Sequence, residues 1–150
     1  MMNNNEYDEN HQGLINLDGL DDMKSYFHLF NRGVNSGNIY YENDNYIFFL
    51  DRLKKYKDKY DISILCYCLM PNHFHLFVKE SSNQDSIGYM IGDLTNSYTK
   101  AINKKYNRTG VLFGGRTKKR IIEKENYFIW LFKYILLNPV WAKLVSKPEG

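Results

Sequence analysis

Two histidines, His73 and His75, stand on either side of one phenylalanine in the segment PNHFHLFV. The segment is rich in apolar and aromatic residues between turn-forming ones, so it is predicted to be a β-strand. Successive side chains of a strand point to opposite faces of the sheet, so the two imidazoles share a face and Phe74 lies on the other. Two imidazoles on one rigid face can bind a single divalent metal ion. The pattern therefore indicates a metal site suited to phosphate chemistry, with an ordinary pair of surface or core histidines as the alternative.

A metal needs more than two protein ligands, and Asn138 is the candidate for the third. It follows Tyr134 by four residues, so on a helix the two side chains lie on one face. If this helix packs over the histidine face, the amide oxygen of Asn138 reaches the metal and Tyr134 lies beside it. Two imidazoles and one oxygen ligand suit Mg²⁺ or Mn²⁺, which would act as a Lewis acid on a phosphate. Tyr134 would then be the nucleophile and form a phosphotyrosine, although a tyrosine taken alone is more often part of a core.

The net charge of +3 over 150 residues conceals a strong asymmetry. Residues 1–25 carry six acids and one base, whereas residues 100–124 carry nine bases and one acid. A basic block of this size favours a polyanionic partner, with a merely solvated face as the alternative. Tyr98, Tyr106 and Phe113 are interleaved with the block, and bases of single-stranded nucleic acid stack on such rings. Single-stranded nucleic acid is therefore the expected partner.

The sequence carries no sign of a membrane or secreted protein. No apolar run approaches the roughly 18 residues of a membrane span, and the first residues lack the basic start and apolar core of a signal peptide. Cys66 and Cys68 have neither the spacing nor a second pair that a zinc site requires, so they read as reduced core thiols. We therefore expect a cytoplasmic protein with no membrane partner.

Hydrophobic periodicity divides the chain into an acidic tail and one domain. Residues 1–25 are expected to form a flexible tail, and residues 26–150 the catalytic domain. Strands are predicted at residues 26–31, 62–69, 73–79 and within 111–122, and helices at about 42–60, 85–106 and 125–137. This order, β-α-β-β-α-β-α, is that of an α+β, ferredoxin-like antiparallel sheet with an added C-terminal helix that carries Tyr134.

Several segments resemble one known family when they are taken in this order. CYCLMPNHFHLFV resembles the His-hydrophobic-His signature of the HUH-type single-strand DNA transposases, in particular the REP-associated tyrosine transposases and their insertion-sequence transposase-like relatives. The other resembling stretches, which extend the likeness to about residues 26–145, are HLFNRGVNSGNIYYENDNYIFFLDRL, TNSYTKAINKKYNRTGVLFGGRTKK and YILLNPVWAKLV.

The resemblance implies a metal-dependent transposase that nicks and rejoins single-stranded DNA, often beside a DNA hairpin. It implies that Tyr134 attacks a phosphate held by the metal on His73, His75 and Asn138, and keeps the 5′-phosphate as a phosphotyrosine. It also makes a homodimer the expected assembly. Charge and position alone assign the DNA contacts, which are Arg32, Lys104, Lys105, Arg116, Lys118, Lys119 and Arg120.

Three other functions remain open at this point. A relative that binds single-stranded nucleic acid without cutting it would share the fold, but retention of the two histidines, Tyr134 and Asn138 argues against it. A replication-initiator-like nickase would share the site but usually has a larger context than 150 residues. A small metal hydrolase would need a carboxylate base beside the metal, and the histidine hairpin contains none.

Overall fold

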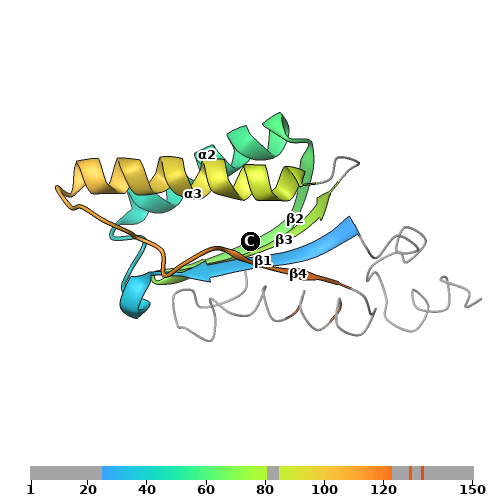
Figure 1. Cartoon of the computed structure of the whole chain (residues 1–150), viewed down its shortest axis with the longest axis horizontal. Coiled ribbons are helices and arrows are strands. Elements are labelled where there is room, and N and C mark those ends of the chain that lie inside the picture. Colours follow the sequence, from blue (N-terminus) through green and yellow to red (C-terminus); the bar gives the residue numbers. More distant parts are fainter. Residues whose placement is uncertain (1–24, 81–84, 123–128, 130–132, 134–150) are drawn as a thin grey trace, which may run out of the picture.

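The computed structural model describes residues 25–80 and 85–122, together with Ile129 and Lys133. Its elements, in chain order, are β1 (Tyr26–Arg32), the 3-10 helix η2 (Val34–Ser36), α2 (Asn43–Lys59), β2 (Ile62–Met70), β3 (His73–Glu80), α3 (Ser86–Lys105) and β4 (Lys118–Ile121). The strands form one antiparallel sheet in the order β2-β3-β1-β4. Figure 1 shows α2 and α3 side by side over one face of this sheet. The predicted ferredoxin-like α+β fold is confirmed.

Most predicted elements match the observed ones to within two residues. The region predicted to hold the last strand is more irregular, because only Lys118–Ile121 forms a strand and Phe113 makes an isolated bridge to Gly33. The predicted tail and the predicted helix over residues 125–137 lie outside the described residues, apart from Ser25 and the two helical residues Ile129 and Lys133. Within the described part of the chain, no helix is long and apolar enough to span a membrane.

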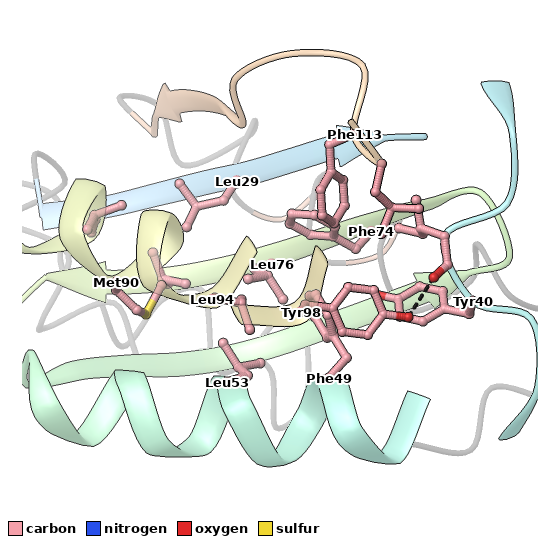
Figure 2. Packing of buried hydrophobic residues seen from close by; sticks show 14 of the residues in the cluster. Leu29, Tyr40, Phe49, Leu53, Phe74, Leu76, Met90, Leu94, Tyr98 and Phe113 are labelled. Atoms are coloured by element: carbon pink, nitrogen blue, oxygen red, sulfur yellow. Dashed lines mark hydrogen bonds between the residues drawn. The ribbon is translucent and has the colours of Figure 1, made fainter. Parts of the chain in front are cut away.

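The hydrophobic core lies between the sheet and the two helices, as Figure 2 shows. Alternate residues of β3 supply one wall of this core, and Leu29 of β1 lies beside them. On α3 the buried residues recur every fourth position, which keeps one helical stripe against the sheet. The core-facing residues of these elements are Phe74, Leu76 and Val78 of β3, Phe49 and Leu53 of α2, and Met90, Leu94, Tyr98 and Ile102 of α3.

Tyr98 joins the core to the loop before α2. Its side chain is fully buried, and its hydroxyl donates a hydrogen bond of 2.5 Å to the carbonyl of Ile39 (Figure 2). Burial and neighbouring tyrosines raise the pKa of the Tyr98 phenol well above its usual value, so the group remains a neutral donor. The same loop holds the turn before β3, because the amides of Ile39 and Tyr40 both donate to the carbonyl of Pro71, at 2.7 and 3.1 Å. The helix layer is thereby tied to the start of β3, which we call the histidine strand because it carries His73 and His75.

A bulge in β2 changes which of its residues face the helices. The register against β3 shifts between Ile64 and Cys66. Before the shift Ile64 pairs with Val78, a core residue, whereas after it Cys66 pairs with Phe77 and Cys68 with His75. Paired residues of an antiparallel sheet share a face, so both cysteines lie on the face opposite the helices. Burial raises the pKa of each thiol to about 12, so both stay protonated at neutral pH.

Candidate functional site

The sheet face opposite α2 and α3 carries the histidines. Because Phe74 and Leu76 face the core, strand alternation places His73 and His75 on the other side. Their ring centroids are 5.2 Å apart and the ring planes are nearly perpendicular, at 88°. We call this surface the histidine face, which comprises His28, Phe30 and Arg32 of β1, Cys66, Cys68 and Met70 of β2, and His73, His75 and Phe77 of β3.

Each of the two histidines has its Nδ1 atom in a hydrogen bond. Nδ1 of His73 lies 2.7 Å from Oδ1 of Asn72, an oxygen that can only accept, so this Nδ1 carries a proton. The other nitrogen of His73, Nε2, therefore has the lone pair that a metal would need. Nδ1 of His75 lies 2.9 Å from Nε2 of His28 on the neighbouring strand.

Burial keeps these imidazoles neutral. It lowers the pKa of His75 to about 3, with the nearby His28, His73 and Arg32 acting in the same direction. It also lowers the pKa of His28 to about 4, assisted by the charge of Arg120. The pKa of His73 is lowered by burial and by Arg32. A metal ligand must be the neutral imidazole, so the site is in the required protonation state at neutral pH.

The pKa values of His28 and His75 predict acid destabilisation of the metal-free protein. Below the ordinary histidine pKa of 6.5, the unfolded chain binds protons at these two side chains that the folded chain does not bind. The free energy of unfolding is therefore retained above pH 6.5 and falls as the pH drops towards 4. By pH 5 each of these two histidines should cost roughly 2 kcal/mol. Urea unfolding at pH 7, 6 and 5 measures this. The pKa of the Glu42 carboxyl is lowered from 4.5 by Lys105 and Tyr106, so this group changes the stability only below this pH range. Constant stability from pH 7 to 5 would contradict the prediction.

The two imidazoles fit a divalent ion only as part of a larger ligand set. Among residues 25–80 and 85–122, no three His, Cys, Asp or Glu side chains form a group that could hold a metal ion. The predicted third ligand, Asn138, and the predicted nucleophile, Tyr134, both lie outside the described residues. What the structure brings together is therefore a pair of neutral nitrogen donors, with Arg32 beside them through its pairing with His73.

The predicted DNA-contacting bases are divided between two faces of the sheet. Lys118 pairs with Phe30 and Arg120 with His28, so both extend the histidine face onto β4, and the guanidinium of Arg120 lies 5.3 Å from the centre of the Phe30 ring. Lys119 pairs with Leu29 on the helix side, where its ammonium lies 4.6 Å from the centre of the Phe27 ring. Alternation along one short strand thus distributes the positive charge over both faces.

A groove of about 770 Å³ lies on the helix side, between α3 and residues 111–119. Lys100 of α3 lines one wall, and Arg116 and Lys119 line the other. The turn that holds Arg116 is fixed by Asn31, whose amide donates to the carbonyl of Gly115 at 3.0 Å and to the hydroxyl of Thr117 at 3.2 Å. Arg116 and Lys119 are therefore brought together, but on the opposite side of the sheet from the two histidines.

The remaining predicted bases lie at the end of α3. Lys105 forms an ion pair of 2.6 Å with Glu42 at the start of α2, so an acid already balances its charge. Lys104 is exposed beside it. Neither residue belongs to the histidine face or lines the groove.

Sequence reasoning missed His28, which contacts His75 directly. The predicted strand over residues 26–31 contained this histidine, but no residue in that stretch pointed to chemistry. A signal was available, because the ferredoxin-like order places the first and third strands side by side, and even-numbered residues of the first strand then share one face. This signal was incomplete, because the register between β1 and β3 is also needed to tell which face of the first strand is the histidine face.

Solved structures are similar to this chain at low sequence identity. A REP-associated tyrosine transposase bound to a REP hairpin matches with a TM-score of 0.69 and 14% identity, over 83% of this chain and 72% of that one. A candidate transposase from Deinococcus radiodurans R1 matches with a TM-score of 0.54 and 14% identity, over 73% of this chain and 87% of that one. At this identity the likeness is one of fold. No curated protein sequence matches significantly.

The family itself is identified by a family model. The model for IS200-like transposases matches residues 23–135, which include the whole sheet, both described helices and both histidines of the histidine strand. This span covers well over half of the 150 residues. The chain therefore belongs to the IS200-like transposase family.

Proposed function

We propose that this member of the IS200-like transposase family cleaves and rejoins single-stranded DNA through a phosphotyrosine. In this proposal His73, His75 and Asn138 hold Mg²⁺ or Mn²⁺, and Tyr134 is the nucleophile. The observation that carries the proposal is the pair of neutral imidazoles on one rigid sheet face, each with Nδ1 in a hydrogen bond. When bound, the metal would supply Lewis-acid activation of the scissile phosphate.

The reaction balances without an external energy source. The phenol oxygen of Tyr134 attacks phosphorus, the bond between phosphorus and the 3′-oxygen breaks, and the leaving strand takes a proton as it departs with a 3′-hydroxyl. The 5′-phosphate remains on the tyrosine as a phosphodiester. A second 3′-hydroxyl then attacks the same phosphorus and returns the proton to Tyr134, so the energy of the broken bond is kept for rejoining.

Burial of the histidine face supports a covering element that carries Tyr134. His28, Cys68 and Phe77 are at most 6% exposed, although α2 and α3 cover the other side of the sheet. We infer that the predicted helix over residues 125–137 packs on the histidine face and brings Tyr134 and Asn138 to the metal. The predicted homodimer allows this helix to come from the same subunit or from the partner.

The cations divide into two proposed roles. Arg32, Lys118 and Arg120 border the histidines and would hold the phosphates next to the cleaved bond. Arg116 and Lys119 line the groove on the other side and would hold a more distant part of the strand, with the planar guanidinium of Arg116 able to make two bonds to one phosphate. The similar REP-associated transposase was solved with a DNA hairpin, which makes hairpin-containing DNA the substrate that we propose here.

A covalent-adduct assay tests this function. The full chain is incubated with labelled single-stranded hairpin DNAs and Mg²⁺ or Mn²⁺, and a denaturing gel separates free DNA from DNA linked to protein. We expect an adduct with the wild type and with Tyr89→Phe, a control at an exposed tyrosine of α3, but not with Tyr134→Phe. An adduct that persists in Tyr134→Phe would refute the assigned nucleophile. Tight binding without any adduct would favour the non-cutting relative.

A further inference from the structure

His28 and His75 meet edge to edge across β1 and β3. Nε2 of His28 and Nδ1 of His75 are 2.9 Å apart, closer than the roughly 3.5 Å at which stacked rings come into contact. The ring centroids are 5.1 Å apart and the planes differ by only 17°, so the rings are nearly coplanar end to end. A lone pair on one ring therefore points along the N–H of the other, which is the geometry of a hydrogen bond.

Only one direction of this hydrogen bond is compatible with a metal ligand. If His28 donates from Nε2, then Nδ1 of His75 is the acceptor and the proton of the neutral His75 ring must sit on Nε2. If His75 donates from Nδ1, then its Nε2 carries a lone pair. The second arrangement matches His73, whose Nδ1 donates to Asn72.

We propose that His28 is a positioning residue for the metal site, whose Nε2 accepts the Nδ1 proton of His75 so that His75 presents Nε2 to the ion. This inference rests on the proposed function. It gives His75 the kind of outer hydrogen-bond partner that fixes the tautomer and ring orientation of metal-binding histidines. The side chain of Asn72 would then orient His73, and the imidazole of His28 would orient His75.

Packing holds the His28 ring in the required plane. The Phe30 ring stacks on the His28 ring, with ring centroids 4.7 Å apart and planes 27° apart. The guanidinium of Arg120 lies over the Phe30 ring. The His28 side chain is 6% exposed, so water has little access to compete for its nitrogen. The ring orientation on which the proposal depends is therefore a property of the packed sheet face.

The second nitrogen of His28 argues for a functional role. Nδ1 of His28 is buried and makes no hydrogen bond to any described residue. Whichever tautomer His28 adopts, this atom loses water without gaining a partner, which disfavours the folded state. An apolar side chain would avoid that loss but would also break the hydrogen bond to Nδ1 of His75. The two effects oppose each other, so stability alone does not explain a histidine here.

Two substitutions separate positioning from packing. His28→Leu removes the acceptor, whereas His28→Gln supplies an amide oxygen as many bonds from Cβ as Nε2 is. Mn²⁺ affinity of the full chain is measured by calorimetry. We expect His28→Leu to weaken Mn²⁺ binding by about 10–100-fold, as for other outer-partner substitutions, and His28→Gln to recover most of this loss. Leu29→Val, on the same strand but in the core, is the packing control and should leave Mn²⁺ affinity unchanged.

A second readout reports directly which imidazole nitrogens carry protons. Nitrogen NMR of the Mg²⁺-saturated wild type should show protons on Nδ1 of both His28 and His75. The melting temperature of metal-free His28→Leu should change little, because the substitution removes one unpartnered buried nitrogen but also breaks the hydrogen bond to Nδ1 of His75.

The possible failures are distinguishable. If the wild type binds Mn²⁺ and His28→Leu binds it equally tightly, the role of His28 is overturned while the metal site stands. A proton on Nε2 of His28 in the Mg²⁺-bound protein would do the same. Wild type that binds no Mn²⁺ would overturn the metal site itself, and the role of His28 with it.

Discussion

His75→Ala is expected to slow formation of the covalent DNA adduct by about a thousandfold, since a catalytic metal contributes several kcal/mol to phosphate activation and each 1.36 kcal/mol is tenfold in rate. The affinity for single-stranded hairpin DNA should stay within the same range, because the described cations are all retained. Adduct formation is followed by a quenched time course with excess enzyme, and affinity by fluorescence anisotropy of labelled DNA. The ratio of the two effects distinguishes a chemical defect from a binding defect.

Cys68→Ala is the matched control for this substitution. Cys68 is buried and pairs directly with His75 in the sheet, so its truncation disturbs the same packed region. Burial raises the pKa of its thiol to about 12 in the metal-free protein, and a soft sulfur atom is a poor ligand for Mg²⁺ or Mn²⁺. We expect Cys68→Ala to retain most of the adduct rate. Comparable losses in the two variants would mean that His75 acts through packing, and would contradict the metal assignment.

The histidine strand could be predicted from sequence because its evidence is local. The alternation of His73, Phe74 and His75 fixes which side chains share a face wherever the strand lies in the sheet. The buried positions of α3 recur at helical spacing and identify its inner side in the same way. Short-range periodicity is enough for both features, since each depends only on neighbours along the chain.

Features that depend on pairing between distant strands could not be predicted in this way. The contact between His28 and His75 joins residues 47 positions apart, and it requires the register of β1 against β3. The bulge near Leu65 is invisible in the alternation of ISILCYCL, yet it decides that the cysteines share the histidine face. The division of Lys118, Lys119 and Arg120 between two faces likewise needs the pairing of β4 with β1. Charge composition identified the basic block along the chain but not how the sheet divides its cations between two faces.

Gly33 is held in close contact with the turn that precedes the histidine strand. Its amide donates to the carbonyl of Asn72 at 2.9 Å, directly before His73, and the next amide, of Val34, donates to Leu112 at 2.9 Å. The loop after it curls back so closely that a Cβ on Gly33 would lie 1.9 Å from the carbonyl oxygen of Gly37. The backbone of Gly33 has φ of −63°, an ordinary value, so the constraint is the contact itself rather than the dihedral angle.

Gly33→Ala is therefore expected to destabilise the fold by about 3 kcal/mol or more, because the clash is with backbone that cannot rotate away. Gly88→Ala on the exposed side of α3 is the matched control, since nothing lies within 4 Å of a Cβ there and alanine favours a helix by about 1 kcal/mol. Urea unfolding of both variants should give changes of opposite sign. If Gly33→Ala remains as stable as the wild type, the loop can yield, and the turn before His73 is not held as tightly as its hydrogen bonds imply. In the expected case, the loss of stability should be accompanied by weaker Mn²⁺ binding in the fraction that folds, because the loop and Asn72 set the position of His73 together.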